Sequence, residues 1–457
     1  NLILTPGSQS FEIWNNIPVP VYLEVYFFNW TNPADLNNPD VKLRMPKFVE
    51  TGPEQQRKIV QQWNDANNTV TFLQNKTWHF DPSLSDGSLD DIITTLNAPA
   101  VAAAFSIRKY PHFMKRSLAM AMALFDTSLH VKKSVRELTF EGYEDPLLEL
   151  AAILPDSLLP TAIPFDKFGW FYTRNNSATY DGVFNMYTGK GHIRNFGKMA
   201  KWNYNNESRG YQSNCNYIKG SAGDLFPPNP KKDSISIFST DICRTITLPF
   251  KEKVFNNGLT GYRYMGDENM LDNSVENTDA GCFCSSGKCP PKGMIDVSSC
   301  KWNAPAFVSF PHFYHADPSY RRAVHGMKPN KSIHEMFLDL EEKTGIPLQV
   351  EASMQINLLL ESHPEYRLLK DVPTIYFPIL WFKQWARIDS SFIAQLKVIK
   401  GISAAGYILL GVFIWLGFAV QIGGYLSYNK NEKNQQFLPL STGEHDQSTK
   451  KHDSSNL

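Results

Sequence analysis

The sequence LQVEASMQINLLL, residues 348–360, alternates apolar and polar side chains with a period of two. Its two faces separate cleanly. The apolar face holds Leu348, Val350, Ala352, Met354, Ile356, Leu358 and Leu360, and the polar face holds Gln349, Glu351, Ser353, Gln355 and Asn357. Period two over this length predicts a half-buried antiparallel β-strand, and so a fold built on an antiparallel sheet.

Further stretches share the β-forming composition. Residues 21–28, VYLEVYFF, are rich in β-branched and aromatic side chains, which favour strands. Shorter candidate strands lie at residues 234–238, 306–310 and 374–380. We therefore expect strands to dominate both ends of residues 1–398.

Helices are expected between these strand-rich ends, at residues 88–155. Ser88, followed by Asp90 and Asp91, has the composition of a helix N-cap with acidic residues in the first turn. An apolar stripe follows at residues 92–96. This pattern predicts a helix that begins near residue 88.

Two more helical pieces are expected in the same region. Residues 113–129 are rich in Ala, Met and Leu, which favour a helix. A third piece carries the spaced apolar residues Val131, Val135 and Leu138. Strands at both ends and helices between them predict an α+β architecture.

The segment ISAAGYILLGVFIWLGFAVQIGGYL, residues 402–426, holds no charged residue. About 20 residues suffice for a helix to cross a bilayer core, so this segment is long enough. A buried core helix is usually shorter and has a polar face. We predict a transmembrane helix at residues 402–426, a large domain before it at residues 1–398, and a short disordered tail at residues 429–457.

All six cysteines lie between positions 215 and 300 and define a disulfide region at residues 215–300. They are Cys215, Cys243, Cys282, Cys284, Cys289 and Cys300. A zinc cluster is one interpretation, because three of them are close in sequence, but such a site usually needs histidine partners. The even number and the absence of a Cys-x-x-Cys pair favour three disulfides, which are typical of secreted and cell-surface domains.

Asn-x-Ser/Thr acceptors for N-glycosylation occur only before the apolar segment. They are Asn29, Asn67, Asn75, Asn175, Asn206 and Asn330. Lysines flank both ends of the segment, so the positive-inside rule does not decide its orientation. Acceptors and cysteines on one side predict that residues 1–398 are luminal or extracellular and that the tail is cytoplasmic. Such a domain needs an N-terminal signal or anchor, which we expect to be missing from this sequence.

Composition excludes several function classes. Lys+Arg and Asp+Glu both total 45, so the net charge is zero and a nucleic-acid partner is not expected. Among the catalytic motifs Gly-x-Ser-x-Gly, His-Glu-x-x-His, phosphate loop and dinucleotide fingerprint, none occurs, so neither an enzyme nor a cofactor is predicted. His312 and His315 are expected to be structural, with no metal site. The 30 Phe, 19 Tyr and 10 Trp could fill a core or line an apolar cavity.

Short motifs follow one another in a characteristic order. They include FNWTNP at 28–33, ETGP at 50–53, GYEDP at 142–146, FPP at 226–228, CFC at 282–284, SFPHFY at 309–314, QIN at 355–357 and PILWF at 378–382. Together they resemble the class B scavenger receptors, the family of fatty-acid translocase and the lysosomal integral membrane receptors. Three of them are most similar to the insect croquemort-like branch: FNWTNP, FPP and PHFY.

The resemblance implies more than the residues alone predict. It implies a large antiparallel β-barrel-like ectodomain, pierced by an apolar tunnel and capped by a helical apex, with one membrane helix at each end of the chain. It also implies the disulfide pairs Cys215–Cys282, Cys243–Cys300 and Cys284–Cys289. After Gly52-Pro53 the family continues with an aromatic strand, whereas this chain continues with EQQR. Compared with the family pattern a few residues are missing here, through either a misassigned exon boundary or a truncated core strand, so disturbed local β pairing is expected.

A basic run precedes the Glu137-Leu138 motif of the expected apex. In the family such a surface binds anionic ligands, which implies that Lys132, Lys133 and Arg136 contact lipoproteins or anionic phospholipid surfaces. The alternative is a solvated helix face, the commonest state of such runs.

Two functions compete. The resemblance implies a plasma-membrane scavenger receptor that binds and takes up lipids, lipoproteins or lipid-bearing particles, including apoptotic cells, and passes lipid through the tunnel to the membrane. The alternative is a lysosomal-membrane sorting receptor that carries a soluble hydrolase at the apex, although the tail lacks an acidic dileucine signal. A purely adhesive glycoprotein would need no lipid cavity. The glycines of residues 402–426 are compatible with a homo-oligomer.

Overall fold

The pairing of β14 (Pro347–Leu360) with β15 (Ile375–Arg387) is the centre of the sheet. On the other side of β15 lies β1 (Val21–Phe27), with Val21 opposite Ala386. In this computed structural model, residues 2–17, 19–36, 50–155, 163–208, 210–211, 213–256, 258–274, 278–284 and 289–435 are described. The chain divides into two units, Asn1–Asp389 and Ser390–Leu457. We call the first unit the body.

Among the described residues, the sheet of the body has 13 strands, and all of its strand pairs are antiparallel. Its main path is β7-β6-β3-β2-β1-β15-β14-β13-β10-β9-β8, and β12 joins β14 to β11. The remaining strands are β2 (Glu50–Asn64), β3 (Thr69–Trp78), β6 (Phe184–Tyr187), β7 (Met199–Trp202), β8 (Ser234–Ser239), β9 (Arg244–Asn256), β10 (Leu259–Met265), β11 (Met294–Asp296), β12 (Ala306–Ser309) and β13 (Phe337–Glu341). The strands predicted at 234–238, 306–310 and 374–380 are confirmed as β8, β12 and β15.

Ser221 links the two ends of this path. It forms a β-bridge to Lys198, next to β7, and another to Ile237 in β8. The sheet therefore closes on itself through one residue, which gives the barrel-like form that the family resemblance implies.

The polar face of β14 is buried, which corrects the prediction of a half-buried strand. Ser353, Gln355 and Asn357 are all 0 % exposed. Gln355 accepts a hydrogen bond from the backbone N–H of His312 at 2.7 Å, and Asn357 donates one to the Ser309 hydroxyl at 3.1 Å. Because the Gln355 and Asn357 amides have partners, burying them costs little, whereas the buried Ser353 hydroxyl has no hydrogen-bond partner among the described residues. The alternation correctly separated the two faces but did not show what covers the polar one.

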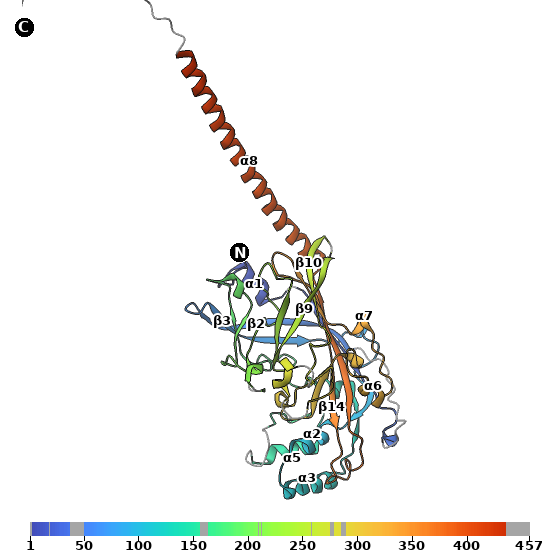
Figure 1. Ribbon diagram of the computed structural model, residues 1–457. Helices are drawn as coiled ribbons and strands as arrows, with labels where there is room; N and C mark the ends of the chain where they lie inside the picture. Colours follow the sequence, from blue (N-terminus) through green and yellow to red (C-terminus); the bar gives the residue numbers. More distant parts are fainter. Residues whose placement is uncertain are drawn as a thin grey trace, which may run out of the picture. The chain divides into compact units, whose positions relative to one another are not determined.

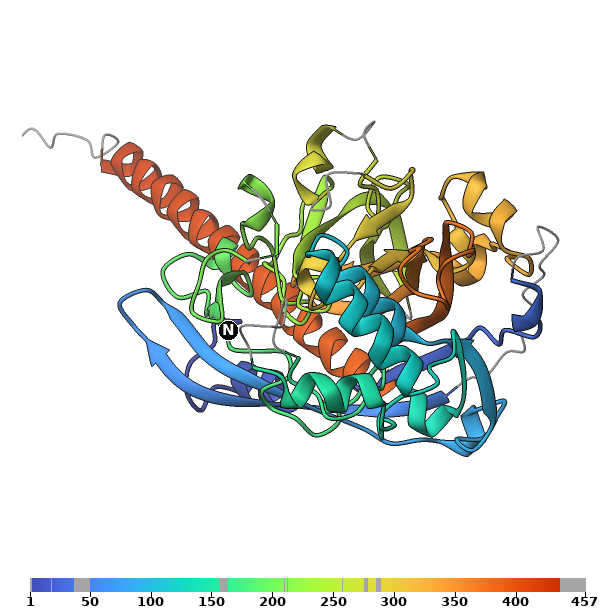
Figure 2. The same ribbon diagram turned by 90° about the horizontal axis from the view of Figure 1, so that it is seen from below.

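The expected helical region contains helices α2 (Ala98–Ser106), α3 (His112–Leu124), α4 (Val135–Leu138) and α5 (Pro146–Ile153). Figures 1 and 2 show α2, α3 and α5 grouped at one end of the body. We call this group the apex. Elsewhere in the body lie the short helices α1 (Gln9–Asn15), α6 (Pro318–Ala323) and α7 (Lys331–His334).

The helix predicted from residue 88 is wrong. Residues Ile92–Leu96 form β4, which pairs with β5 (His130–Ser134). Ser88 caps only a turn, where its hydroxyl accepts from the N–H of Asp90 at 3.2 Å. The β-branched sequence IITT favours a strand. Its partner strand begins at His130, well beyond the local pattern, and the pairing with it decides the outcome.

Two other expectations need correction. The helix expected over 113–129 ends at Leu124, and Val131 lies in β5 rather than in a helix. The strand expected to be truncated after Gly52 is continuous, because β2 runs through Pro53 opposite Tyr22 and on to pair with β3. The missing residues therefore do not interrupt this part of the sheet.

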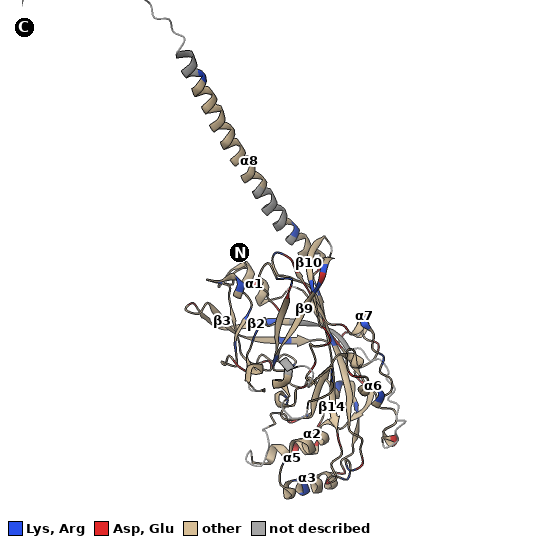
Figure 3. Ribbon diagram, in the orientation of Figure 1, with Lys and Arg blue, Asp and Glu red and all other residues tan. Residues whose placement is uncertain are grey.

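The second unit contains the long helix α8 (Ser390–Gln435), of 46 residues. Within it, Ile408–Lys430 is the one stretch among the described residues that is long and apolar enough to span a membrane. Figure 3 shows Lys or Arg near both ends of α8 and no charged residue among the described residues between them. The helix continues through residues 429–435, which were expected to belong to the tail, and the rest of the tail lies outside the described residues.

Candidate functional site: an apolar cavity with a charged end

A cavity of about 1130 Å³ lies between the apex and the inner face of the sheet. Helices α2, α3 and α5 form one wall, largely with Ala and Leu side chains, and strands β12, β14 and β15 form the other. Met354, Ile356 and Leu358, from the apolar face of β14, line it directly. The volume slightly exceeds the range of about 300–1,000 Å³ that is usual for small-molecule sites.

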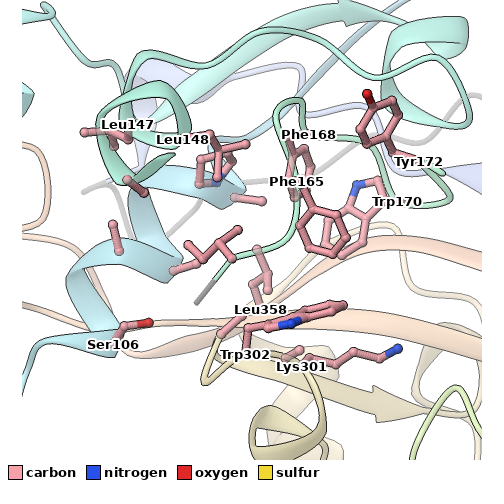
Figure 4. A pocket seen from close by; sticks show the side chains of 18 of the residues that line it. Ser106, Leu147, Leu148, Phe165, Phe168, Trp170, Tyr172, Lys301, Trp302 and Leu358 are labelled. Carbon is pink, nitrogen blue, oxygen red and sulfur yellow. The ribbon is translucent and has the colours of Figure 1, made fainter. Parts of the chain in front are cut away.

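Aromatic side chains from the segment FDKFGWFY, residues 165–172, cover one side of the cavity (Figure 4). Phe165 meets Trp302 edge to face, with ring centroids 4.6 Å apart. Gly169 allows the segment to pack tightly, because a Cβ there would lie 2.7 Å from the carbonyl oxygen of Thr139. The sequence analysis missed this segment, although its five aromatic residues in eight positions were a visible signal.

The edge of the cavity on α3 exposes apolar side chains to water. Phe113, Met120 and Leu124 line the cavity and are 67 %, 73 % and 81 % exposed, respectively. Large apolar side chains grouped on a surface usually mark a binding site, since each costs free energy when it faces water. This edge is therefore a candidate entrance for an apolar ligand.

Charged side chains gather at one place on the cavity wall. Arg174, Asp241 and Lys301 line the cavity, and the Arg174 guanidinium donates a hydrogen bond of 3.0 Å to the Asp241 carboxylate. Asp181 lies 3.8 Å from Arg174 and 3.0 Å from the ammonium group of Lys76. We call these five residues the charged end.

The charged end has strongly perturbed ionisation. Burial disfavours the charge on Arg174, but the Asp241 and Asp181 carboxylates outweigh burial and raise the pKa of Arg174. Burial likewise opposes ionisation of Asp241, yet Arg174, Lys301 and Lys76 hold its pKa below the usual range. Burial lowers the pKa of Lys301 despite the nearby Asp241. Mutual attraction therefore keeps Arg174 and Asp241 charged inside a largely apolar wall.

Three disulfides hold the loops beside the cavity. The structure joins Cys215 to Cys282, Cys243 to Cys300 and Cys284 to Cys289, which is the pairing that the family resemblance implies and not a zinc cluster. Lys301 directly follows Cys300, and Asp241 lies two residues before Cys243, so both are next to the Cys243–Cys300 disulfide in the sequence. This disulfide therefore fixes two residues of the charged end relative to each other.

The predicted basic residues of the apex lie away from the cavity. Lys132 and Lys133 lie in β5, and Arg136 lies in α4. Lys133 is 3.4 Å from Glu137, and Arg136 is 3.1 Å from both Asp90 and Glu141. Their carboxylate partners reduce the positive potential, so a role in binding anionic surfaces stays a prediction.

The six glycosylation acceptors differ in their surroundings. Asn67, Asn206 and Asn330 are exposed. The other three have bonded amides: Asn29 accepts from the N–H of Thr94 at 2.9 Å, Asn75 donates to Asn176 at 3.0 Å, and Asn175 donates to the Trp78 carbonyl at 3.2 Å.

His312, in the SFPHFY motif, and His315, directly after it, have separate environments. His312 stacks on His334, with ring centroids 4.6 Å apart, whereas His315 contacts Phe310 and Tyr314. Among the described residues, no group of three or more His, Cys, Asp or Glu side chains is arranged to hold a metal ion.

Comparison with known proteins agrees with this architecture. The sequence model of the CD36 family matches residues 1–428. The chain belongs to the CD36 family. Protein peste of Drosophila melanogaster is 34 % identical over 418 residues, covering 90 % of this chain and 74 % of that protein. Scavenger receptor class B member 1 of Bos taurus is 30 % identical over 461 residues (95 % and 87 %). Lysosome membrane protein 2 of Rattus norvegicus is 33 % identical over 431 residues (92 % and 87 %).

Family membership and the apolar part of α8 together fit a membrane protein. The resemblance read from the motifs is therefore confirmed at the level of the family, whereas the croquemort-like branch stays a prediction.

Proposed function

We propose that this CD36 family member is a cell-surface scavenger receptor that binds and takes up lipids, lipoproteins or lipid-bearing particles, apoptotic cells among them. Its domain at residues 1–398, which contains the body, would face the extracellular side, carry the glycans and deliver lipid to the membrane that α8 spans. One observation carries the proposal: an apolar cavity of about 1130 Å³ whose edge on α3 exposes apolar side chains.

The physical argument is the cost of apolar surface in water. Burial of apolar area releases about 25 cal/mol per Å², so an acyl chain or sterol in this cavity is strongly favoured over the same chain in water. The exposed residues of α3 reduce the barrier to entry, because the ligand meets apolar surface before it leaves its carrier.

The test uses cells that express the full-length glycosylated chain and a photoreactive, alkyne-tagged fatty acid or sterol. Irradiation should attach the probe to peptides that line the cavity, and excess untagged lipid should compete. Ala103→Trp fills the cavity from α2 and should reduce labelling and lipid uptake at least about fivefold. The control is Ala323→Trp on α6, which is exposed and outside the cavity. Equal labelling of both variants would contradict the proposal.

A sorting receptor for a soluble protein is the alternative function. Leu124 and Ile153 at the apex are 81 % and 79 % exposed and could contact a protein partner instead of lipid. Replacement of both by Ser would then abolish hydrolase delivery to lysosomes. Under the lipid-receptor proposal, hydrolase delivery does not depend on this chain.

A further inference from the structure

Tyr204 occupies a costly position in the tight turn that follows β7. The Trp202 N–H donates to the Asn205 carbonyl at 2.8 Å, and the Asn205 N–H donates to the Trp202 carbonyl at 3.0 Å. Asn203 and Tyr204 are therefore the two central residues of a hairpin turn, and their φ angles are 48° and 64°. Asn is common in such a turn, whereas the second central position usually takes Gly, because a side chain there is strained. The fold alone would favour Gly at position 204.

The side chain of Tyr204 faces water. It is 68 % exposed, so its ring contributes little to the core of the body. A large aromatic side chain at a position that is both strained and exposed is unfavourable twice over. Such a residue is explained if something outside the protein core packs on its ring.

An acceptor for N-glycosylation lies two residues after Tyr204. The sequence is Asn206-Glu207-Ser208, and Asn206 is exposed. Among the six acceptors, only Asn206 and Asn29 have an aromatic residue two positions before them. At Asn29 this residue is Phe27, which is 1 % exposed and belongs to the core. Tyr204 is therefore the one exposed ring in this position relative to an acceptor.

Ser208, the third residue of this acceptor, is not explained by the fold. It is 1 % exposed, and its hydroxyl has no hydrogen-bond partner among the described residues. A buried hydroxyl without a partner costs free energy, so Ala would be more favourable in the folded body. The hydroxyl is instead required for recognition of Asn206 as an acceptor, before the chain folds. This points to a glycan at Asn206.

We propose that the first N-acetylglucosamine of a glycan on Asn206 stacks on the ring of Tyr204 and thereby holds the turn closed. Two residues span at most about 7 Å of chain, so the ring and the first sugar are within reach of each other. The inference rests on the extracellular placement that the proposed function includes, and not on lipid binding.

The attraction has a simple physical basis. One face of a pyranose ring presents C–H groups, and the face of an aromatic ring carries partial negative charge, so the two faces attract and exclude water. If the contact is as strong as an aromatic pair, it shifts an equilibrium by about threefold to tenfold.

The held turn also supports the disulfide region. The Ile218 N–H donates to the Asn206 carbonyl at 3.1 Å, and the Ser208 N–H donates to the Asn216 carbonyl at 2.7 Å. Asn216 directly follows Cys215, which is bonded to Cys282. The sugar would therefore stabilise a strand pair that leads directly to this disulfide.

The test uses the full-length chain from cells in which glycan processing is blocked at the high-mannose stage. Endoglycosidase H trims each glycan to its first N-acetylglucosamine, and a second portion is deglycosylated completely. Hydrogen exchange at the Trp202 and Asn205 amides, which close the turn, measures how often it opens. Exchange should be equally slow with the whole glycan and with the single sugar, and about threefold to tenfold faster without sugar.

Variants then separate the ring from the sugar. In the glycosylated chain, Tyr204→Ala should accelerate exchange about as much as Asn206→Gln, and the double variant should be no faster than either single variant. Tyr204→Phe keeps the ring and should behave like the wild type. The matched control is Asn67→Gln, because Asn67 is an exposed acceptor in the turn between β2 and β3 but follows Asp65 rather than an aromatic residue. Exchange in that turn should not change.

Additive effects of Tyr204→Ala and Asn206→Gln, or slow exchange that persists after complete removal of the sugar, overturn the inference. So does glycopeptide mass spectrometry that finds a glycan on Asn67 but none on Asn206. A chain without a glycan on any acceptor is a different result, because it contradicts the extracellular placement itself. If a variant does not fold, the comparison between the trimmed and the fully deglycosylated wild type still decides.

Discussion

The guanidinium of Arg174 and the carboxylate of Asp241 form a hydrogen-bonded ion pair of 3.0 Å on the wall of an apolar cavity. Removing Asp241 leaves the Arg174 guanidinium with only the more distant Asp181 carboxylate, at 3.8 Å. We expect Asp241→Ala to destabilise the body by about 2–3 kcal/mol, less than the loss at a fully buried pair, because Asp241 is 35 % exposed. Thermal unfolding measures the change. Asp65→Ala, which breaks the exposed pair with Lys190, should cost less than about 0.5 kcal/mol, and equal losses would contradict the prediction.

Phe72 anchors a second core, separate from the cavity. It is 0 % exposed, stacks on Phe184 at 5.3 Å and meets Trp14 edge to face at 4.8 Å. We expect Phe72→Ala to cost about 3–5 kcal/mol, because it removes buried area and leaves a cavity. Phe255→Ala, at a 74 % exposed position, should stay within about 0.5 kcal/mol. Urea unfolding measures both, and a small effect at Phe72 would place it outside the core.

The disulfides should contribute unequally. Cys243–Cys300 closes a loop of 57 residues, whereas Cys284–Cys289 closes one of five. Loop-closure entropy predicts that replacing the first pair by serine costs about 2 kcal/mol more than replacing the second. Only the first replacement should also weaken lipid labelling of the cavity, because it frees the loop of Lys301 and Trp302, which line the cavity. Denaturation measures the loss of stability and photoreactive labelling measures the loss of lipid binding, and equal results for the two disulfides would contradict the prediction.

The stacked pair His312 and His334 makes stability sensitive to acid. Burial lowers the pKa of His312 to about 4, and burial with repulsion from His312 lowers that of His334 to about 3. The Nδ1 atoms accept hydrogen bonds from the N–H groups of Lys328 and Asn330, at 3.1 and 3.0 Å, so protonation there would break them. Both pKa values lie below the ordinary value of about 6.5, so the unfolded state binds more protons below that pH.

Stability should therefore be complete above about pH 6.5 and fall as the pH drops from 6.5 towards about 4, by the order of 2–4 kcal/mol. His312→Asn retains an acceptor near the position of Nδ1 but cannot be protonated, so it should flatten this dependence. Melting temperatures between pH 7.5 and 4.5 test it, with His192→Asn, at an exposed position, as the control. A slope unchanged in His312→Asn would show that other groups cause the acid sensitivity.

Glycan occupancy should follow the surroundings of each acceptor. The amide of Asn175 bonds both the N–H and the carbonyl of Trp78, at 2.9 and 3.2 Å, whereas Asn67 and Asn206 are exposed. We expect higher occupancy at Asn67 and Asn206 than at Asn175, because a glycan on Asn175 would give up a hydrogen bond to β3. Glycopeptide mass spectrometry measures occupancy, and full modification of Asn175 would contradict the expectation.

The period-two pattern of residues 348–360 predicted the central strand and also the residues that face the cavity, because Met354, Ile356 and Leu358 lie on its apolar face. The family motifs implied the barrel-like sheet and the apex. Burial of Ser353 could not be predicted, since the elements that cover it come from distant parts of the chain. Local patterns also failed at β4, where a cap-like sequence masked the β-branched residues that follow it.

The charged end shows the same limit. Lys76, Arg174, Asp181, Asp241 and Lys301 are spread over more than 200 positions, and no spacing rule connects them. A hint was present, because Asp241 and Lys301 each lie within two residues of a cysteine that a disulfide pairs. The sequence shows where the cysteines lie. Only the fold shows that the Cys243–Cys300 disulfide places Asp241 and Lys301 on the cavity wall.

The pairing of β1 with β15 also sets the order in which the molecule can mature. Val21 in β1 lies opposite Ala386 in β15. The first strand therefore cannot pair with β15 until this last strand of the sheet has been synthesised. Contacts this distant in sequence form slowly, and an unpaired strand edge is prone to aggregation meanwhile. Completion of the sheet must therefore follow synthesis of nearly the whole body, and a nascent chain that stops short of β15 should be retained by chaperones rather than exported.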